Sequence, residues 1–212
     1  MLFNTRFRRA GLALLTAAAL GLSAPNASAG EAPSSIVLFS GVDAAPDVIY
    51  AYQGIVIALN KDLGRDGFLL KLYSSYVGYE YDTSAVPGGV VDGDGWQGDV
   101  MLGYKKGFNH SYAAIFAGVD VQNHRLTPDD PANPVRGTEV GFKIGLDYET
   151  LMGLPFYFGA NGIYSTAFNT YWARVRAGLP VGHNIIIGPE ALALGNDGFD
   201  AQRLGGFLRL DT

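Results

Sequence analysis

Three polar residues of the sequence have the types found in serine hydrolases. His110 and Ser111 are adjacent, and Glu139 follows at a distance that a neighbouring antiparallel strand would bridge. A nucleophilic serine needs a histidine base within hydrogen-bonding distance and an acidic residue that orients this base. Successive residues of a strand point to opposite faces, so His110 and Ser111 would meet only at a turn or bulge. A turn that contains both residues is the simpler interpretation, and a lipid- or glycan-modifying enzyme stays the less favoured alternative.

The carboxylates and histidines have no metal-binding spacing. Asp92, Asp94 and Asp99 stand among glycines, as in a calcium loop. However, Trp96 and Gln97 occupy the positions where an EF-hand carries an oxygen ligand and a glycine. The three histidines have no metal-ligand spacing, and the chain contains no cysteine. The sequence therefore predicts a non-enzymatic protein without metal or cofactor.

Most of the remaining charges alternate with apolar residues. In 96–104 and 139–149, one set of alternate residues is apolar with aromatic ends, and the other holds charges, Gln97 and glycines. Because strand residues alternate between two faces, each segment predicts a strand with one apolar and one polar face. The charges predicted to face one another across a narrow interior are Asp99, Glu139, Lys143, Asp147, Glu149, Arg174, Arg176, Glu190, Arg203 and Arg209. A structural network of ion pairs and hydrogen bonds is the favoured interpretation, and a polar pore or saccharide-contacting surface is the alternative.

These charges must be positioned by long strands. The same alternation and the turn-rich segments between its repeats predict ten strands. Their predicted ranges are 34–42, 48–60, 68–82, 94–105, 111–123, 137–149, 155–165, 170–179, 184–194 and 201–211. Most have about ten residues, the length of a membrane-crossing strand, whereas strands of soluble proteins have about five or six. We therefore expect an all-β, antiparallel up-and-down transmembrane β-barrel of about 10 strands (8–12); a periplasmic lipocalin-like or sandwich domain is the soluble alternative.

The connections between these strands differ in length. With both termini placed in the periplasm, the two longest, 83–93 and 124–136, fall on the outer side, as in outer-membrane barrels. No apolar run of 18 residues that could form a transmembrane helix follows the first segment of the chain. The loop lengths thus support the barrel prediction.

The first 29 residues have the pattern of an export signal. Arg6, Arg8 and Arg9 precede an uncharged apolar run, and Ala27 and Ala29 supply the small residues of a cleavage site. We expect a secretory signal peptide at 1–29, cleaved after Ala29, and one outer-membrane β-barrel domain at 30–212. The run is too short for a membrane-spanning helix.

Composition excludes several classes of protein. The chain of 212 residues is 48% apolar and 17% charged, with 29 glycines and a formal charge of −5. This apolar content excludes a disordered chain, and the negative charge argues against nucleic acid as a partner. Without cysteine the chain has no disulfide, thiol nucleophile or lipoprotein anchor.

Several short segments resemble the BcsS family of bacterial cellulose biosynthesis proteins. The segments are LNKDL (59–63), DGF (66–68), VDGDGWQGD (91–99), DPANPVRG (130–137), YSTAFNTYWAR (164–174), GPE (188–190) and GNDGFDAQR (195–203). Their order, over about residues 48–210, is more specific than any one of them. The resemblance implies an outer-membrane-type barrel that assists cellulose production or secretion, with no established catalytic activity.

The resemblance also implies which residues to watch. It adds Gln97 and Gln202 to the candidates for the interior or rim, and it implies loop or glycan contacts for Trp96, Arg136, Asn169, Trp172, Asn196 and Asp200. The implied partners are outer-membrane lipid and the cellulose chain or its secretion machinery. A narrow passive pore remains an alternative function.

Overall fold

The fold is one sheet of long antiparallel strands. The computed structural model describes residues 15–16, 34–151, 153–182 and 184–210, so the expected export signal lies outside the described residues apart from 15–16. The strands are β1 (Leu15–Thr16), β2 (Ile36–Ala45), β3 (Val48–Ala58), β4 (Gly67–Asp82), β5 (Val90–Gly107), β6 (Ser111–Thr127), β7 (Gly137–Thr150), β8 (Tyr157–Ser165), β9 (Tyr171–Gly182), β10 (Ile185–Asn196) and β11 (Phe199–Leu210). A short 3₁₀ turn, η1 (Ala167–Asn169), precedes β9, and no described helix is long and apolar enough to cross a membrane.

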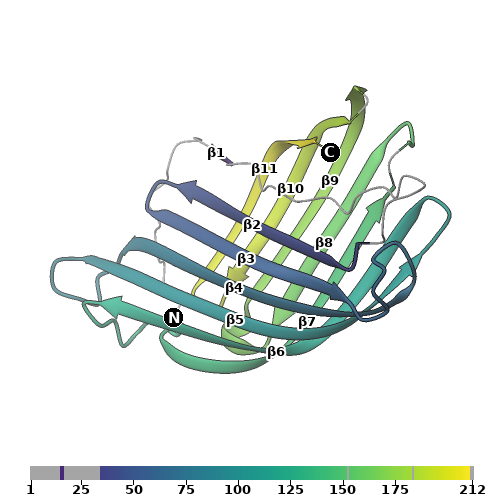
Figure 1. The fold of residues 1–212 in the computed structure, drawn as a ribbon. Coiled ribbons are helices and arrows are strands. Elements are labelled where there is room, and N and C mark those ends of the chain that lie inside the picture. Colours follow the sequence, from purple (N-terminus) through teal and green to yellow (C-terminus); the bar gives the residue numbers. More distant parts are fainter. Residues whose placement is uncertain (1–14, 17–33, 152, 183, 211–212) are drawn as a thin grey trace.

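Each strand pairs with the next in chain order, from β1 to β11. The prediction of an all-β, up-and-down arrangement with about ten long strands is confirmed. Figure 1 shows the sheet curling so that β2 and β11 return to the same side of the molecule. Among the described residues no ladder joins β2 to β11, so the sheet is a curled half-barrel with two outer edges.

Strand ends differ from the prediction where turns are tighter than expected. The first hairpin was expected to have a loop over 43–47, but β2 continues to Ala45 and pairs with Val48 across two residues. Asp47 adopts a positive φ of 66°, which Asp tolerates better than most residues and which permits this short turn. The glycine- and aspartate-rich segment from 90 also lies in a strand, because the β5–β6 ladder extends to Asp92 and Thr127.

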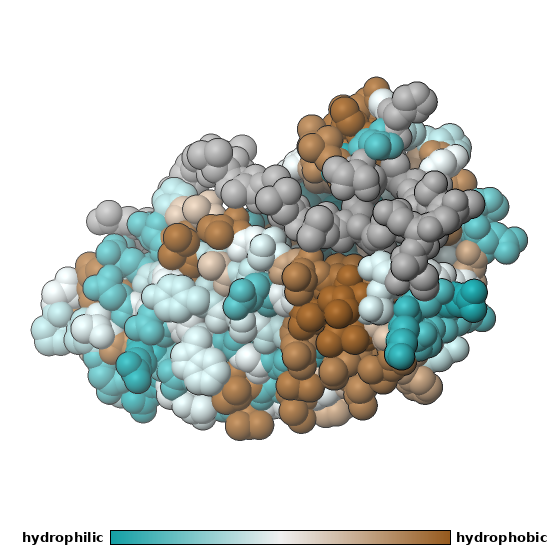
Figure 2. Space-filling view, in the orientation of Figure 1, coloured by the Kyte–Doolittle hydropathy of each residue, from teal (hydrophilic) through white to brown (hydrophobic). Residues whose placement is uncertain are grey.

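The two faces of the sheet differ in polarity, as the alternation predicted. Most large side chains on the convex face are apolar and exposed, for example Val140 at 76% and Leu204 at 81%. Figure 2 shows a continuous apolar patch on one side of the molecule, bordered by hydrophilic residues. The concave face holds the buried residues, including a cluster around Met101 and Phe116 at one end. An apolar exterior around a partly polar interior reverses the usual order of a soluble domain.

Glycines let the concave face pack tightly. Gly93 of β5 lies under the ring of Tyr79 on β4, and a Cβ atom at Gly93 would come within 2.3 Å of that ring. Gly93 is therefore needed for close packing of a side chain against the strand, and not for a turn.

Candidate functional site

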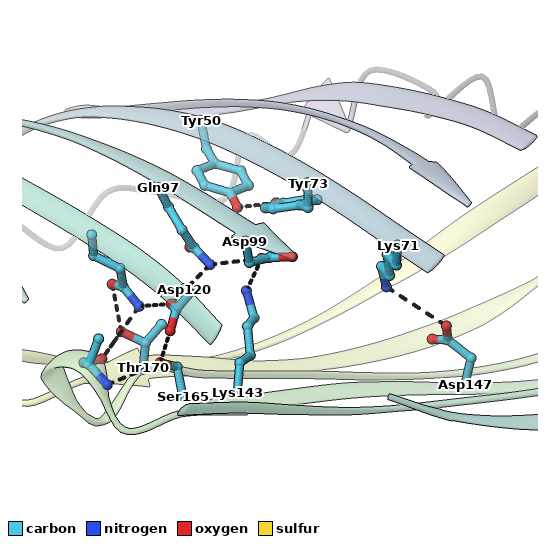
Figure 3. Close-up of polar contacts among 12 residues, drawn as sticks. Tyr50, Lys71, Tyr73, Gln97, Asp99, Asp120, Lys143, Asp147, Ser165 and Thr170 are labelled. Atoms are coloured by element: carbon cyan, nitrogen blue, oxygen red, sulfur yellow. Dashed lines mark hydrogen bonds and ion pairs between the residues drawn. The ribbon is translucent and has the colours of Figure 1, made fainter. Parts of the chain in front are cut away.

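A buried ion pair lies at the centre of the concave face. Lys143 of β7 donates to Asp99 of β5 over 2.5 Å, and their side chains are only 2% and 1% exposed. Gln97 donates to the same carboxylate over 3.3 Å. The other Asp99 oxygen, Oδ1, is buried and has no hydrogen-bond partner among the described residues. Figure 3 shows these side chains converging from separate strands, with Tyr50 and Tyr73 above them.

The ion pair continues into a hydrogen-bond chain toward η1. Asp120 of β6 accepts hydrogen bonds from Gln97, Gln122 and Ser165 at 3.4, 2.8 and 2.6 Å. Thr170, just after η1, donates to Gln122 at 3.0 Å (Figure 3). We call the residues Gln97, Asp99, Asp120, Gln122, Lys143, Ser165 and Thr170 the central network. It joins four neighbouring strands and the η1 turn through side chains.

The η1 turn is folded onto the concave face. Phe168 is only 1% exposed and its ring meets that of His124 edge-on at 5.3 Å. Its backbone N–H donates to Glu139 at 2.8 Å, and its carbonyl accepts from the N–H of Asp197 at 2.9 Å. Phe168 and Asn169 have positive φ values of 50° and 48°, an unfavourable conformation for a phenylalanine that the surrounding contacts must stabilise.

A second polar group surrounds Glu149 near the opposite ends of the strands. Arg176 and Tyr157 donate to Glu149 Oε1 at 2.9 and 2.8 Å, and Arg209 and Tyr112 donate to Oε2 at 3.2 Å each. Each carboxylate oxygen of Glu149 therefore accepts two hydrogen bonds. We call these five residues the Glu149 network.

Asp147 links this network to the rest of the interior. It accepts from Asn161 at 2.9 Å and lies 3.9 Å from the ammonium group of Lys71. Arg176 also donates to Asn161, at 3.3 Å.

A third group of charges lies toward the open side of the half-barrel. Arg174 of β9 stacks on Trp172 with 5.2 Å between the guanidinium carbon and the ring centre, and its buried Nε atom has no hydrogen-bond partner in the described part of the chain. Glu190 of β10, Arg203 of β11 and Asp43 of β2 lie on the same concave side as Arg174. These charges therefore line the inner side of the first long strand and of the last three.

The residues expected to be loop or glycan contacts do not form one cluster. Asn169 donates to Asp197 at 2.9 Å and accepts from Tyr164 at 2.8 Å, both at the exposed rim. Trp96 is on the convex face at 48% exposure, Arg136 pairs with Asp129 at 3.3 Å, and Trp172 packs against Arg174. Asn196 accepts a hydrogen bond from the N–H of Gly198, and Asp200 accepts one from Tyr171.

Gln202 was expected in the interior or at the rim, but its side chain is on the convex face, next to the concave Arg203. Residues of β11 alternate between the two faces, and Gln202 has the outward parity.

The hydrolase-like residues are far apart. Ser111 pairs with Thr150 and Glu139 pairs with Gln122, at opposite ends of the β6–β7 ladder. They cannot form a nucleophile, base and orienting acid in this arrangement. Within the described ranges, no group of three or more histidine, aspartate or glutamate residues could hold a metal ion.

Several residues of the central network were not singled out by sequence reasoning. The resemblance had pointed to Ser165, but Asp120, Gln122 and Thr170 were not candidates. Asp120 and Gln122 carried the available signal, since they alternate with apolar residues in 113–121. The sequence did not show the strand registers, which bring Ser165 of β8 within hydrogen-bonding distance of Asp120 on β6.

The polar side chains of the interior bond mainly to one another. The buried lysine, aspartates and hydroxyls hydrogen-bond across strands, and Phe168 covers them at one end. Such a network stabilises and specifies an interior.

Comparisons with known proteins agree with this picture. The family model described as cellulose biosynthesis protein BcsS matches residues 37–210, which span β2 to β11. No curated protein and no solved structure matches the chain. A match over most of the chain, together with the ten-stranded antiparallel fold, establishes the family and with it a role in cellulose biosynthesis. The chain belongs to the cellulose biosynthesis protein BcsS family.

Proposed function

We propose that the protein is a non-enzymatic barrel of the bacterial outer membrane that assists the secretion of cellulose. The observation that carries the membrane location is the exposed apolar convex face. Ile115, Leu102 and Phe68 are 63%, 61% and 63% exposed, and they lie on neighbouring strands. A continuous exposed apolar surface of this kind is costly in water and is stabilised by lipid (Figure 2).

A scaffold fits the interior better than an open pore. Lys143, Asp99 and Asp120 are buried at the middle of the concave face, and the η1 turn lies over them. A water-filled conduit would leave such side chains solvated. This packing supports a filled interior and a function at the rim.

The rim is the surface proposed to contact the cellulose chain or the secretion machinery. The described connection 83–89 and the connection 128–136 are the longest at the end of the sheet where η1 lies, which is the end expected to face outward. Asn169 and Asp197 connect two of the shorter turns at this end. Loops held by a rigid scaffold are common sites of recognition.

Deletion of the gene tests this function. We expect extracellular cellulose to fall sharply while cellulose synthase activity in isolated inner membranes stays unchanged, and the wild-type gene should restore secretion. A deletion strain that secretes normal amounts of cellulose, or that loses synthase activity in isolated membranes, would contradict the proposal.

A further inference from the structure

Within the described ranges, the half-barrel has two outer strands, β2 and β11, with few or no partner residues along their outer edges. On β2, the described chain pairs only Asp43 and Ala44 with the two residues of β1. The outer edge of β11 has no partner strand among the described residues. Free edges attract other strands, and in lipid their unpaired N–H and C=O groups cost several kcal/mol each. The fold therefore requires a partner for both edges.

The side chains of the two edge strands are in phase. In β2 and in β11 the odd-numbered residues face the concave side and the even-numbered residues face outward. The outward residues include Leu38 and Val42 on β2 and Leu204 and Leu208 on β11, all more than 40% exposed. Neither strand contains proline, so every backbone N–H can donate.

The backbone hydrogen-bonding groups on the outer edges of β2 and β11 also have the same parity. Each strand joins its hairpin partner through a two-residue turn, with Ala45 opposite Val48 and Asn196 opposite Phe199. The residues that flank such a turn exchange hydrogen bonds, so the odd-numbered residues of both strands bond to the hairpin partner. The bond from the N–H of Ala58 to the carbonyl of Ser35 follows the same pattern. On both free edges the groups left to bond belong to even-numbered residues.

One register brings opposite charges side by side. Asp43 of β2 and Arg203 of β11 both lie on the concave side of the sheet, although no ladder among the described residues joins their strands. When Asp43 stands opposite Arg203, Phe39 meets Phe207 inside the sheet and Leu38 meets Leu208 outside. This register uses all ten residues of β2.

We propose that β2 and β11 pair as antiparallel strands with Asp43 opposite Arg203, and that this ladder closes the sheet into a barrel. The even number of long strands makes β11 antiparallel to β2, as closure requires. The strand registers also agree with closure. If one starts at a residue of β2, follows the paired residues from strand to strand and returns through the proposed ladder, one reaches β2 about ten residues further along. This displacement is the shear of the barrel, and it equals the number of strands, as it does in the eight-stranded (β/α)₈ barrel. The expected cleavage after Ala29 would remove β1 and leave this edge to β11.

The absence of cysteine makes a direct test possible. Two pairs in the proposed register, Leu38→Cys with Leu208→Cys and Val42→Cys with Leu204→Cys, are introduced separately into the full chain. The matched control pairs Leu38→Cys with Leu210→Cys, which has the same side-chain types but is displaced by two residues. Directly opposite Cα atoms lie about 5 Å apart and suit a disulfide, whereas the displaced pair lies about 7–8 Å apart and does not.

We expect both in-register pairs to form an intramolecular disulfide after mild oxidation, seen as a reducible shift in gel mobility, with little crosslinking in the control. Intermolecular dimers alone would overturn the proposal, because they would show that the edges pair with a second copy. Stronger crosslinking of the control pair would overturn the register, and failure of all three pairs would show an open sheet. The crosslink is read in whichever cell fraction holds the protein, so it can fail independently of the proposed role in cellulose secretion.

Discussion

Replacing Lys143 with methionine should destabilise the fold more than any surface charge substitution. The change removes the ammonium group that lies 2.5 Å from Asp99, in a pair with side chains 2% and 1% exposed. Asp99 would keep the hydrogen bond from Gln97 but lose its counter-charge, and its second oxygen has no partner among the residues that the structure describes. Removing one member of a buried ion pair costs about 3–5 kcal/mol because the other charge is left buried.

The double variant separates the charge from the packing. Asp99→Asn with Lys143→Met removes both charges and leaves a neutral amide that can still accept from Gln97. The double variant should lose clearly less than the sum of the single losses, with a coupling free energy of at least about 1 kcal/mol. The assay is urea-dependent folding into lipid vesicles, followed by tryptophan fluorescence and by heat-modifiable gel mobility.

An exposed pair supplies the matched control. Arg136→Met breaks the pair of Arg136 with Asp129, whose side chains are 46% and 67% exposed, and should cost no more than about 1 kcal/mol. If Lys143→Met costs no more than Arg136→Met, or if the single losses simply add, the central network does not stabilise the interior and the reasoning fails.

Four further predictions address the turns and the second network. The pKa of the Asp66 carboxyl is lowered by the hydrogen bond from Lys106 and by one from a backbone N–H. The ionised carboxyl therefore stabilises the fold above its unfolded pKa, and this contribution is lost as the pH falls through its folded pKa. The difference in unfolding free energy between wild type and Asp66→Asn should accordingly vanish in acid, as measured by pH-dependent unfolding. Phe168→Ala should cost about 3–5 kcal/mol in vesicle unfolding, since it empties a buried site. Glu149→Gln should cost at least about 2 kcal/mol in the same assay, because two arginines lose a charged acceptor. Asn169→Ala should lower cellulose secretion while leaving protein abundance and heat-modifiable mobility unchanged.

Each of these predictions has a contrary result. A stability difference for Asp66→Asn that grows in acid would reverse the assigned direction of the pKa shift. Wild-type stability of Phe168→Ala would show that η1 does not pack on the interior, and wild-type stability of Glu149→Gln would show that its donors are solvated. Normal secretion by Asn169→Ala would remove this rim position from the proposed contact surface.

The strands could be predicted because their alternation is long and regular. Residues 137–149 were predicted as a strand, and β7 spans Gly137–Thr150. The face of each charge followed from the same alternation, which placed Asp99 and Lys143 inside. Period-two patterning is a local property, so one sequence is enough to show it.

The contacts between strands could not be predicted in the same way. Register depends on turn geometry, and the turn at Pro46 and Asp47 is shorter than its composition suggested. The inward fold of η1 depends on a left-handed Phe168. The local sequence disfavours this conformation, and long-range contacts such as those with His124, Glu139 and Asp197 stabilise it.

The most direct test of the proposed membrane location is the density at which the untreated wild-type protein sediments. Cell envelopes are separated on a sucrose gradient, and the fractions are run on gels with and without heating. The proposed outer-membrane barrel should be recovered with outer-membrane markers and should migrate differently before and after heating. Recovery in the soluble periplasmic fraction, with no effect of heating, would contradict it.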